Sequence, residues 1–572
     1  MNEYTPREFK FSTQARKLIE DYYMLDTEND IEQVFRRASN AFSKGDAALA
    51  ERMFDYVSKG WMMYSSPVIS NAPTDDGITK FRGLPISCFL TALDDSLESL
   101  IDHSTETRWL SISGGGIGAD WSRVRYVSDK APGVIPFLHT MDADVTAYKQ
   151  GKTRKGAYAA YLDVSHPDIL EFINIRVPTG GDVNRKCFNV HNAVTIPDEF
   201  MKAVIENRDW NLIDPHTKAV KNTINARELW ERILEIRFRT GEPYFLFKDT
   251  ANKALPKEMR DAGFQIRSSN LCNEIMLPTD ADYTAVCCLS SVNLEYFDQW
   301  KDTEMVEDLT VFLNNVLDYF IENAQPTLAN AIKSAKFERS IGIGAMGFHS
   351  YLQMNDIEWE SLTAKMVNMQ IFKHIKEKAL KQSEAMGRCD AVSTRRNAHL
   401  LAIAPNANSG MMLGTSPSIE PLKSNAYVHR TRVGSHFIKN RYLDQLLQRL
   451  EMNTEEVWDS ITKHHGSVQH LEFLSEHDKA VFKTAFELDQ RWIIEHAADR
   501  QQFVCQGQSV NLFFPLGTAK SYVNQVHLDA WKKGLKGLYY LRTESDRKIE
   551  SVSNKVIREK LVDYDECLSC QG

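Results

Sequence analysis

Apolar residues recur at intervals of three and four over residues 9–60, a spacing that predicts helices. The repeat includes Ala15, Leu18, Ile19, Tyr22 and Tyr23. A polar stretch bearing Pro and Gly follows over residues 65–85 and interrupts this periodicity. The pattern therefore predicts a helical N-terminal region over residues 1–80.

From Cys88 onward, short apolar runs alternate with longer amphipathic segments. The runs at 194–196, 341–344 and 401–404 are expected to be buried strands or strand ends, and 228–240 and 366–385 to be helices. Alternation of this kind is typical of an α/β protein with parallel strands. We expect this region to span residues 81–543 and to include a charged helical subdomain near 425–500. Residues 544–572 are strongly charged and are expected to form a flexible C-terminal tail.

Composition limits the classes of protein that fit. The chain has 572 residues, 43% of them hydrophobic and 25% charged, which is ordinary for a soluble globular protein. The net charge of −9 disfavours broad nucleic-acid binding, and no apolar run approaches the roughly 18 residues of a membrane span. The N-terminus lacks a signal peptide, and nine cysteines without framework spacing indicate reduced thiols. We therefore expect a cytoplasmic protein that binds neither nucleic acid nor membrane.

One pentad, Asn270-Leu271-Cys272-Asn273-Glu274, has the composition of a reaction centre. If the segment is extended, residues two apart lie on the same face, so an amide, a thiol and a carboxyl group would project together. A thiol between a hydrogen-bonding amide and a general base suits redox or radical chemistry.

The C-terminus carries a second thiol motif, Cys567-Leu568-Ser569-Cys570. A C-x-x-C pair usually serves redox exchange or metal ligation. A structural zinc site needs a second such pair, which the sequence lacks, so a mobile redox-active dithiol is favoured. The alternative is a frayed tail with incidental cysteines.

Two Gly- or Asn-rich segments are ambiguous. Residues 113–120 satisfy G-x-G-x-x-A, but the preceding residues 105–110 are typical of a helix end, whereas a dinucleotide site needs a strand there. A Gly-rich turn for close packing or substrate approach is favoured instead. Residues 404–411 follow an apolar strand and suit either a phosphate-binding helix start or an ordinary N-cap. Judged by this segment alone, the ordinary N-cap is favoured.

A group of histidines and a pair of tyrosines do not by themselves indicate a function. His464, His465, His470 and His477 match no metal-binding spacing, so solvated helix faces explain them and no metal site is predicted. Tyr539-Tyr540, taken alone, is most simply a half-buried strand pair.

Taken together, the motifs resemble the catalytic (large, alpha) subunit of class I ribonucleotide reductases, from about residue 65 to the C-terminus. The matching segments, in sequence order, are Pro-Ile-Ser-Cys at 85–88, Gly-Gly-Gly-Ile-Gly at 114–118, Asn-Leu-Cys-x-Glu at 270–274, Cys-x-Leu-Ser-Ser-x-Asn-Leu at 287–294, Pro-Asn-Ala-Asn-Ser at 405–409, Tyr-Tyr at 539–540 and the tail dithiol. Any one of them could arise by chance, but the ordered set could hardly do so.

The resemblance implies a ten-stranded α/β barrel of two parallel five-stranded half-barrels, with Cys272 on a finger loop inside it. It implies that Cys272 becomes a transient thiyl radical that takes the ribose 3′ hydrogen, that Glu274 accepts the 3′-hydroxyl proton and that Asn270 binds the ribose hydroxyls. Cys88 and Cys287 would be the reducing pair, and the Cys567/Cys570 tail would reduce their disulfide. The adjacent Cys288 would have a packing role.

The resemblance also implies substrate and partner contacts. The phosphate-contact and substrate positions correspond to Ser66, Ser87, Gly116, Asn406, Ala407, Asn408 and Ser409. Tyr539 and Tyr540 would relay a radical from a separate ferritin-like small (beta) subunit, whose dimetal or tyrosyl cofactor supplies it, so this chain would bind no cofactor. Thioredoxin or glutaredoxin would be the reductant, and the substrates would be ribonucleotides, most simply diphosphates.

Two departures from the family pattern concern regulation. The chain starts directly in the helical region, which indicates a compact form without the N-terminal ATP cone, and suits a viral protein acting in host cytoplasm. The first specificity loop, at 125–134, is short, whereas the second is recognisable at 151–156 and includes Arg154. We therefore expect weak effector binding, no dATP-dependent shutdown, and a monomer or weak dimer, since the expected interface helix at 135–149 is polar.

Two rival functions are weighed against this one. An adenosylcobalamin-dependent class II reductase would share the barrel and the active cysteines, but paired tyrosines favour radical entry from a separate subunit. A non-catalytic thiol-exchange or nucleotide-binding protein would explain the tail but not the Asn-Cys-Glu row.

Overall fold

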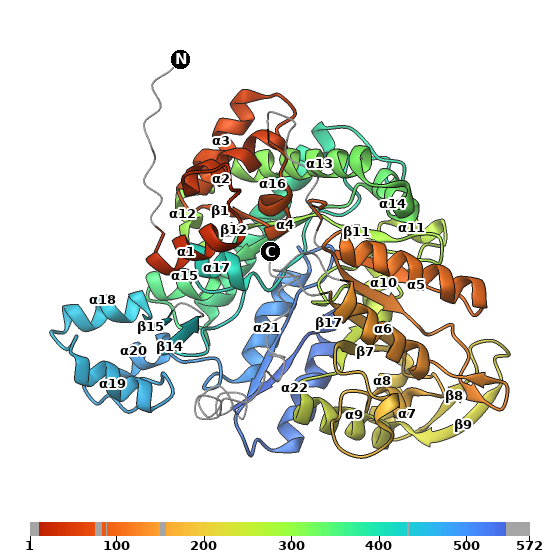
Figure 1. Ribbon diagram of the computed structural model, residues 1–572. Helices are drawn as coiled ribbons and strands as arrows, with labels where there is room; N and C mark the ends of the chain where they lie inside the picture. The colour runs from red at the N-terminus through yellow and green to blue at the C-terminus, as the bar shows by residue number, and fades with distance from the viewer. Residues whose placement is uncertain (1–10, 75–82, 87, 149–155, 432–433, 545–572) are drawn as a thin grey trace.

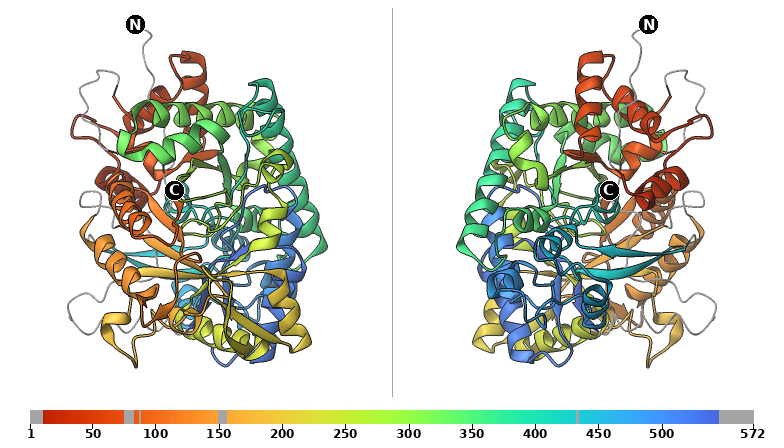
Figure 2. Two further views of the ribbon diagram at one scale, coloured as in Figure 1. Left: turned by 90° about the vertical axis from the view of Figure 1, so that its right-hand side faces the viewer. Right: turned by 90° about the vertical axis from the view of Figure 1, so that its left-hand side faces the viewer.

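The computed structural model describes residues 11–74, 83–86, 88–148, 156–431 and 434–544. Helices form an outer layer around a central group of strands (Figure 1), and the same arrangement is visible from two further directions (Figure 2). Among the described residues, no helix is both long and apolar enough to cross a membrane.

The helices expected between residues 9 and 60 are present. They are α1 (Thr13–Tyr22), α2 (Ile31–Ala41) and α3 (Ala47–Ser58), and the side chains of Ser12, Asp30 and Asp46 accept hydrogen bonds from the first backbone N–H groups of each. Strand β1 (Met62–Tyr64) and the short helix α4 (Ser66–Asn71) follow and lead towards the strands of the core.

The first half of the core is a run of parallel strands. Its order is β2 (Cys88–Ala92), β3 (Gly116–Asp120), β6 (Tyr158–Asp163), β7 (Val190–Ile196) and β10 (Tyr244–Phe247). The helices between them include α5 (Leu97–Ile112), α6 (Ile135–Ala147), α8 (Asp198–Glu206) and α9 (Ala226–Thr240). These strands are buried along almost their whole length, as expected for a parallel sheet covered by helices.

The second half of the core is built around β12 (Leu289–Asn293) and β13 (Gly342–Met346), which pair in parallel. Isolated parallel bridges continue the pairing from Ile343 to Leu401 and from Ile403 to Gln508. The helices α13 (Met305–Asn323), α14 (Ala329–Glu338), α15 (Phe348–Met354) and α16 (Leu362–Ala385) belong to this half. The expected strand at 341–344 and the expected helix at 366–385 are therefore confirmed, whereas 401–404 contributes isolated bridges and no strand of its own.

The α/β barrel predicted from the sequence is confirmed, with additions at the edges. Strand β11 (Ala285–Cys287) pairs antiparallel with β2, β17 (Gly537–Leu538) pairs antiparallel with β10, and β1 pairs antiparallel with β12. These additions matter because β11 and β17 carry or adjoin the cysteines and tyrosines of interest.

The Gly-rich segment is more ordered than the expected turn. Gly114, with φ of 94°, follows the end of α5, but Gly116 to Asp120 form the fully buried strand β3. The order of elements is helix then strand, the reverse of a dinucleotide-binding turn. The rejection of that motif is confirmed, whereas its description as a turn applies only to the first glycines.

The C-terminal part contains a small separate core. The hairpin β14 (Ala426–Thr431) and β15 (Gly434–Lys439) packs with α18 (Arg441–Arg449), α19 (Glu455–Lys463) and α20 (Glu476–Val481) around residues such as Leu443, Trp458 and Phe482. These elements lie on the left of Figure 1 and face the viewer in the right panel of Figure 2. The chain then returns to the main core through α21 (Gln490–Gln501), β16 (Leu512–Phe514), α22 (Lys520–Lys532) and β18 (Leu541–Thr543).

The remaining short elements connect these units. They are β4 (Val127–Ser128), β5 (Ala131–Pro132), α7 (Ile169–Phe172), β8 (Asp209–Ile213), β9 (Val220–Asn225), α10 (Lys248–Lys253), α11 (Lys257–Asp261), α12 (Phe297–Trp300) and α17 (Ala407–Leu413).

Candidate active site

Cys272 lies in a tight turn, not on the extended segment that the alternation of residues suggested. The backbone N–H of Asn273 donates to the carbonyl of Asn270 at 3.2 Å, and Asn273 has a left-handed φ of 63°. The Asn270 side-chain oxygen accepts from the backbone N–H groups of Glu274, at 3.0 Å, and Ile275, at 3.1 Å. The extended prediction is wrong because the Asn270 side chain offers the backbone a turn, and Asn tolerates the left-handed conformation at 273.

The turn is fixed against the inner strands of the barrel. A Cβ on Gly118 of β3 would lie 1.7 Å from the carbonyl oxygen of Ser269, so this close approach requires glycine. The Tyr161 hydroxyl of β6 donates to the carbonyl of Asn270 at 2.8 Å, and the Asn273 side chain donates to the carbonyl of Phe245 in β10 at 2.9 Å. Asn270, Cys272 and Glu274 are consequently fully buried.

The structure brings Cys88 to this turn. The Asn270 side-chain N–H donates to Cys88 Sγ at 3.3 Å. In the sheet, Cys88 lies opposite Cys287 of β11 on one side and opposite Gly116 of β3 on the other. The expected pair Cys88 and Cys287 therefore occupies directly opposed backbone positions.

Cys288 lies elsewhere. Its thiol is buried in the main core, contacts the carbonyl of Leu313 at 3.5 Å, and burial raises its pKa well above the usual range. This environment agrees with the packing role expected for it.

The Glu274 carboxyl group is buried and incompletely hydrogen-bonded. Burial, followed by the nearby Cys88 thiol, raises its pKa well above the usual range. The Ser509 hydroxyl lies 3.2 Å from Glu274 Oε2 and 2.6 Å from the carbonyl oxygen of Cys272. Within the described part of the chain, Glu274 Oε1 has no hydrogen-bond partner. An unpartnered oxygen in a carboxyl group near the Cys88 thiol suits a group that exchanges a proton with a bound ligand.

Tyr539 and Tyr540 lead from Cys272 towards the β10 side of the core. The Tyr539 hydroxyl donates to Cys272 Sγ at 3.5 Å, and the two tyrosine rings have centroids 4.3 Å apart. Both are buried, at 3% and 4% exposure, between β17 and β18, so the half-buried strand pair considered from sequence is wrong. Tyr244 packs against both, with ring centroids 4.8 and 5.1 Å away.

The candidate phosphate contacts fall at two short helix starts. Asn406, with a left-handed φ of 52°, is the N-cap of α17, and its side chain donates to the carbonyl of Ala345 at 3.1 Å. Ser409 Oγ is buried and, among the described residues, lacks a hydrogen-bond partner. Ser66 begins α4 and its hydroxyl lies 2.8 Å from that of Tyr23. α17 contacts both α1 and β1, the strand that leads into Ser66.

Four expected site residues, Ser87, Arg154, Cys567 and Cys570, lie outside the described residues. A cluster of three or more His, Cys, Asp or Glu side chains suited to metal binding is not found within the described ranges.

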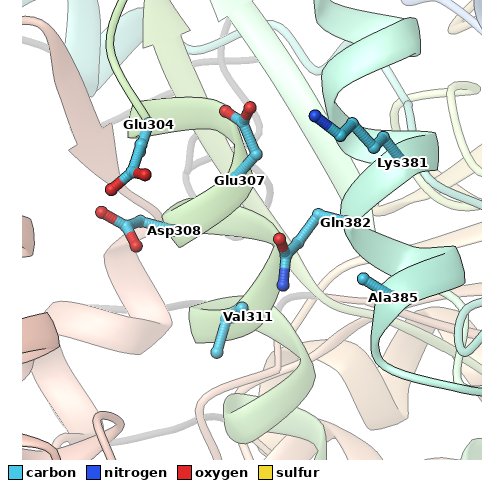
Figure 3. Close-up of a pocket in the computed structure, with 7 residues that line it drawn as sticks. All are labelled: Glu304, Glu307, Asp308, Val311, Lys381, Gln382 and Ala385. Atoms are coloured by element: carbon cyan, nitrogen blue, oxygen red, sulfur yellow. The ribbon is translucent and has the colours of Figure 1, made fainter.

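A surface cavity of about 260 Å³ lies between α13 and α16 and shares no residue with this site (Figure 3). Two of its three carboxylates are already paired: Asp308 binds Arg52 at 2.7 Å, and Glu307 binds Lys378 at 2.8 Å. The cavity is lined by Glu304, Glu307, Asp308, Val311, Lys381, Gln382 and Ala385.

Comparison with known families and proteins accounts for nearly the whole chain. Residues 86–394 and 390–541 match the family described as "Ribonucleotide reductase, barrel domain", and residues 9–77 match "Ribonucleotide reductase, all-alpha domain". The chain belongs to the ribonucleotide reductase family.

Individual relatives agree with this assignment. The chain is 50% identical over 575 residues to the protein of Frog virus 3 (isolate Goorha) that is named as a ribonucleoside-diphosphate reductase large subunit, covering 99% of each. It is 43% identical to the ribonucleoside-diphosphate reductase large subunit of Invertebrate iridescent virus 3, covering 98% of each. Among solved structures, the class Id ribonucleotide reductase alpha subunit of Actinobacillus ureae has a TM-score of 0.84 and 36% identity, covering 94% of this chain and 98% of that chain.

The solved structure is of a class I alpha subunit and the viral relatives are named as large subunits, which favours a class I ribonucleotide reductase over the class II alternative.

Several residues around this candidate site have no distinctive signal in the sequence. Ser509, Tyr161 and Tyr244 contact the finger loop or the tyrosines, yet each lies in an ordinary strand-like or polar run. Lys536 and Gly537 do have a signal, because they directly precede Leu538-Tyr539-Tyr540.

Proposed function

We propose that this chain is the catalytic subunit of a class I ribonucleotide reductase, which converts ribonucleoside diphosphates to 2′-deoxyribonucleotides by a thiyl-radical mechanism. The observation that carries the proposal is the continuous contact from Tyr540 through Tyr539 to the buried sulfur of Cys272. The diphosphate level of the substrate is supported by the names of the viral relatives.

In the first half of the reaction, a thiyl radical on Cys272 removes the hydrogen atom from C3′, which forms the Cys272 S–H bond and leaves a carbon radical. Glu274 accepts the proton of the 3′-hydroxyl group, and its unpartnered Oε1 is the atom available for it. Asn270 has its side-chain oxygen engaged by two backbone N–H groups, so its side-chain N–H is the group left to bind ribose oxygen.

In the second half, Cys88 gives a proton to the 2′-hydroxyl group, which leaves as water. Cys88 and Cys287 together supply two electrons and two protons and end as a disulfide. Glu274 returns its proton to the 3′ oxygen, and the hydrogen on Cys272 returns to C3′, which restores the thiyl radical. Residues directly opposite in an antiparallel pair have Cα atoms about 4.5–5.5 Å apart, within the range that a disulfide spans.

The substrate phosphates are proposed to bind at the starts of α4 and α17, with Ser66, Ser87, Asn406, Ala407, Asn408 and Ser409 as contacts and Gly116 alongside the sugar. Free backbone N–H groups at helix starts suit anions. The buried, unpartnered hydroxyl of Ser409 supports this placement.

Partners and regulation follow from the same proposal. A ferritin-like small subunit with its own dimetal or tyrosyl cofactor would deliver the radical to Tyr540. Thioredoxin or glutaredoxin would regenerate the Cys88/Cys287 pair through the Cys567/Cys570 tail, and Arg154 would belong to a loop that responds to effectors. The enzyme would act in the cytoplasm, and its iridescent-virus relatives suit a viral protein working in a host cell.

The test is a turnover assay with each candidate radical source. We expect deoxyribonucleotide formation with a ferritin-like partner subunit and a dithiol reductant, and none with adenosylcobalamin alone. Product formed with adenosylcobalamin and no partner would contradict the class I mechanism, and no product under either condition would contradict the enzyme function.

A further inference from the structure

Lys536 is buried without a carboxylate partner. Its side chain is almost entirely inaccessible, at 3% exposure, and no ion pair involves it in the described part of the chain. Its ammonium group instead donates to three successive backbone carbonyls, of Val504 at 3.2 Å, Cys505 at 2.5 Å and Gln506 at 2.6 Å. An ammonium group has three N–H donors, so this set of acceptors satisfies it completely.

The carbonyls that Lys536 binds lie directly before the residues that hold the finger loop. The backbone N–H of Gly507 donates to the carbonyl of Glu274 at 2.7 Å. Two residues later, the Ser509 hydroxyl contacts both the Cys272 carbonyl and the Glu274 carboxyl group. Next, the carbonyl of Val510 accepts from the backbone N–H of Tyr539 at 2.8 Å. We name residues 504–510 the strap.

The backbone of Lys536 approaches the finger loop from the other side. Its carbonyl accepts from the N–H of Phe247 at 2.8 Å, and Gly537 pairs with Leu246 of β10. A Cβ on Gly537 would lie 2.6 Å from the side-chain nitrogen of Asn273, which itself donates to the carbonyl of Phe245. The contacts thus form a closed circuit: Lys536, the strap, the Cys272 turn, β10 and back to Lys536.

We propose that Lys536 is a positioning residue for radical transfer, whose ammonium group holds the strap and thereby fixes Tyr539 and Glu274 relative to Cys272. This rests on the proposed function, because it concerns the same tyrosine-to-thiol contact. Every other contact in this circuit involves backbone or a residue of the turn or the strap. The Gln501 side chain also binds the strap, donating to the carbonyls of Val504 at 2.9 Å and Gln506 at 3.0 Å. Lys536 differs from Gln501 because its own backbone also joins the strap to β10.

The charge of Lys536 gives the circuit a dependence on pH. Burial, opposed by Cys505 and reinforced by Lys376, lowers the pKa of Lys536 to about 8. His399 also faces this charge, and burial keeps it neutral because its own pKa is lowered to about 3. Below pH 8 the ammonium group holds all three carbonyls. Above it, the neutral amine has only two N–H groups and turns a lone pair towards a carbonyl oxygen, so its hold on the strap weakens while the Gln501 contacts remain.

The experiment compares the full chain, with its partner subunit and a small dithiol, as wild type, Lys536→Met and Lys536→Gln between pH 6.5 and 9.5. A misplaced reacting group costs about 100-fold in rate, so Lys536→Met should lower kcat roughly 10- to 100-fold with KM nearly unchanged. Wild-type kcat should fall as the pH rises through about 8, whereas both variants should lack this fall. Lys536→Gln, which keeps uncharged N–H donors, should retain more activity than Lys536→Met.

Matched controls isolate the charge. Lys532→Met removes an exposed lysine from the end of α22 and should leave the pH profile unchanged. Cys505→Ser should preserve the fall above pH 8, because it leaves Lys536 and the three carbonyls in place. A Lys536→Met enzyme with wild-type kcat, or with the wild-type fall in kcat above pH 8, would overturn the proposal.

A second readout does not need turnover. Peptide mapping after alkylation should show faster labelling of Cys272 in Lys536→Met than in wild type, relative to the buried Cys187 as an internal reference. Equal labelling ratios would count against the strap even if the wild-type protein showed no reductase activity. Absence of wild-type turnover would instead count against the proposed function.

Discussion

At the level of single residues, the sulfur of Cys272 is defined by what surrounds it and not by exposure. It is fully buried, with a phenol hydroxyl at 3.5 Å, and its own backbone carbonyl is bound by Ser509. The pentad 270–274 could be identified from the sequence because its residue types are specific. The geometry of the pentad could not be predicted, because the same residue types are compatible with a turn closed by an Asn side chain and with an extended strand.

Replacing Cys272 tests the assigned chemistry. Cys272→Ser should abolish turnover while nucleotide binding and thermal stability stay close to wild type, because an alcohol O–H bond is too strong for the oxygen to serve as the radical carrier. Deoxynucleotide formation is the measurement. Cys288→Ala is the matched control, since Cys288 packs in the core against Leu313, and it should keep most of the activity. Measurable product from the serine variant would refute the thiyl assignment.

Glu274 gives a prediction about stability and pH. Its pKa is raised in the folded state, mainly by burial, so folding is favoured when it is protonated. This contribution is complete below the unfolded pKa of about 4.3 and is lost as the pH rises through the folded pKa. Glu274→Gln cannot ionise, so its melting temperature should exceed that of wild type at pH 8 and match it near pH 4. Its turnover should be lost.

The control for this comparison is Glu472→Gln, at an exposed position, whose melting temperature should follow that of wild type at every pH. A Glu274→Gln variant less stable than wild type at pH 8 would mean that the buried carboxylate is compensated in the folded protein.

At the level of elements, the position of the finger loop is decided by close backbone contact with β3. The sequence indicated a Gly-rich segment for close approach, and Gly118 is where that approach occurs. The partner in the contact, Ser269, could not be inferred, because nothing local links residues more than a hundred positions apart.

Gly118→Ala should therefore displace the loop. The added Cβ would meet the backbone oxygen of Ser269 at 1.7 Å and the Cα of Asn270 at 2.9 Å, and neither atom belongs to a flexible side chain. Overpacking of this kind costs about 1–3 kcal/mol, and a shifted Cys272 should lower kcat by about 100-fold or more. Thermal unfolding and turnover measure the two effects; full activity would show that the loop can retreat without loss of geometry.

The tyrosine segment between β17 and β18 gives the second prediction at this level. Tyr539→Phe and Tyr540→Phe should each block turnover without preventing association with the partner subunit, because the ring remains but the oxidisable phenol is removed. Tyr319→Phe is a suitable control, since its ring packs against Phe42 in the core. Full activity of either relay variant would remove the case for radical entry by this route.

At the level of the whole molecule, an α/β fold with parallel strands could be predicted because apolar runs and amphipathic segments alternate over hundreds of residues, whereas the barrel was implied only by the resemblance to the family. The edge strands could not: β11 and β17 are too short to produce a pattern, and only long-range pairing with β2 and β10 defines them. The expectation that the helix at 135–149 presents a polar surface was also incomplete, because two of its acidic side chains are bound within the chain. On α6, Asp142 and Asp144 are occupied within the chain, by Asn189 at 2.9 Å and Arg108 at 3.0 Å.

The neighbouring helix α5 changes the expectation for self-association. Leu97 and Ile101 are 70% and 64% exposed, and Trp109 and Ile112 are 39% and 43% exposed farther along the same helix. The helix runs outward from the middle of the molecule to its right-hand side in Figure 1. An apolar stripe of this length is typical of a protein–protein contact, so we predict a weak, concentration-dependent dimer through α5.

The double substitution Leu97→Ser and Ile101→Ser should shift the dimer to monomer in sedimentation velocity across a concentration series. Leu362→Ser with Met366→Ser, at 73% and 71% exposure on α16, is the matched control and should not change the association. A wild-type protein that stays monomeric at every concentration, or a dimer dissociated by the α16 pair, would show that α5 is not the contact.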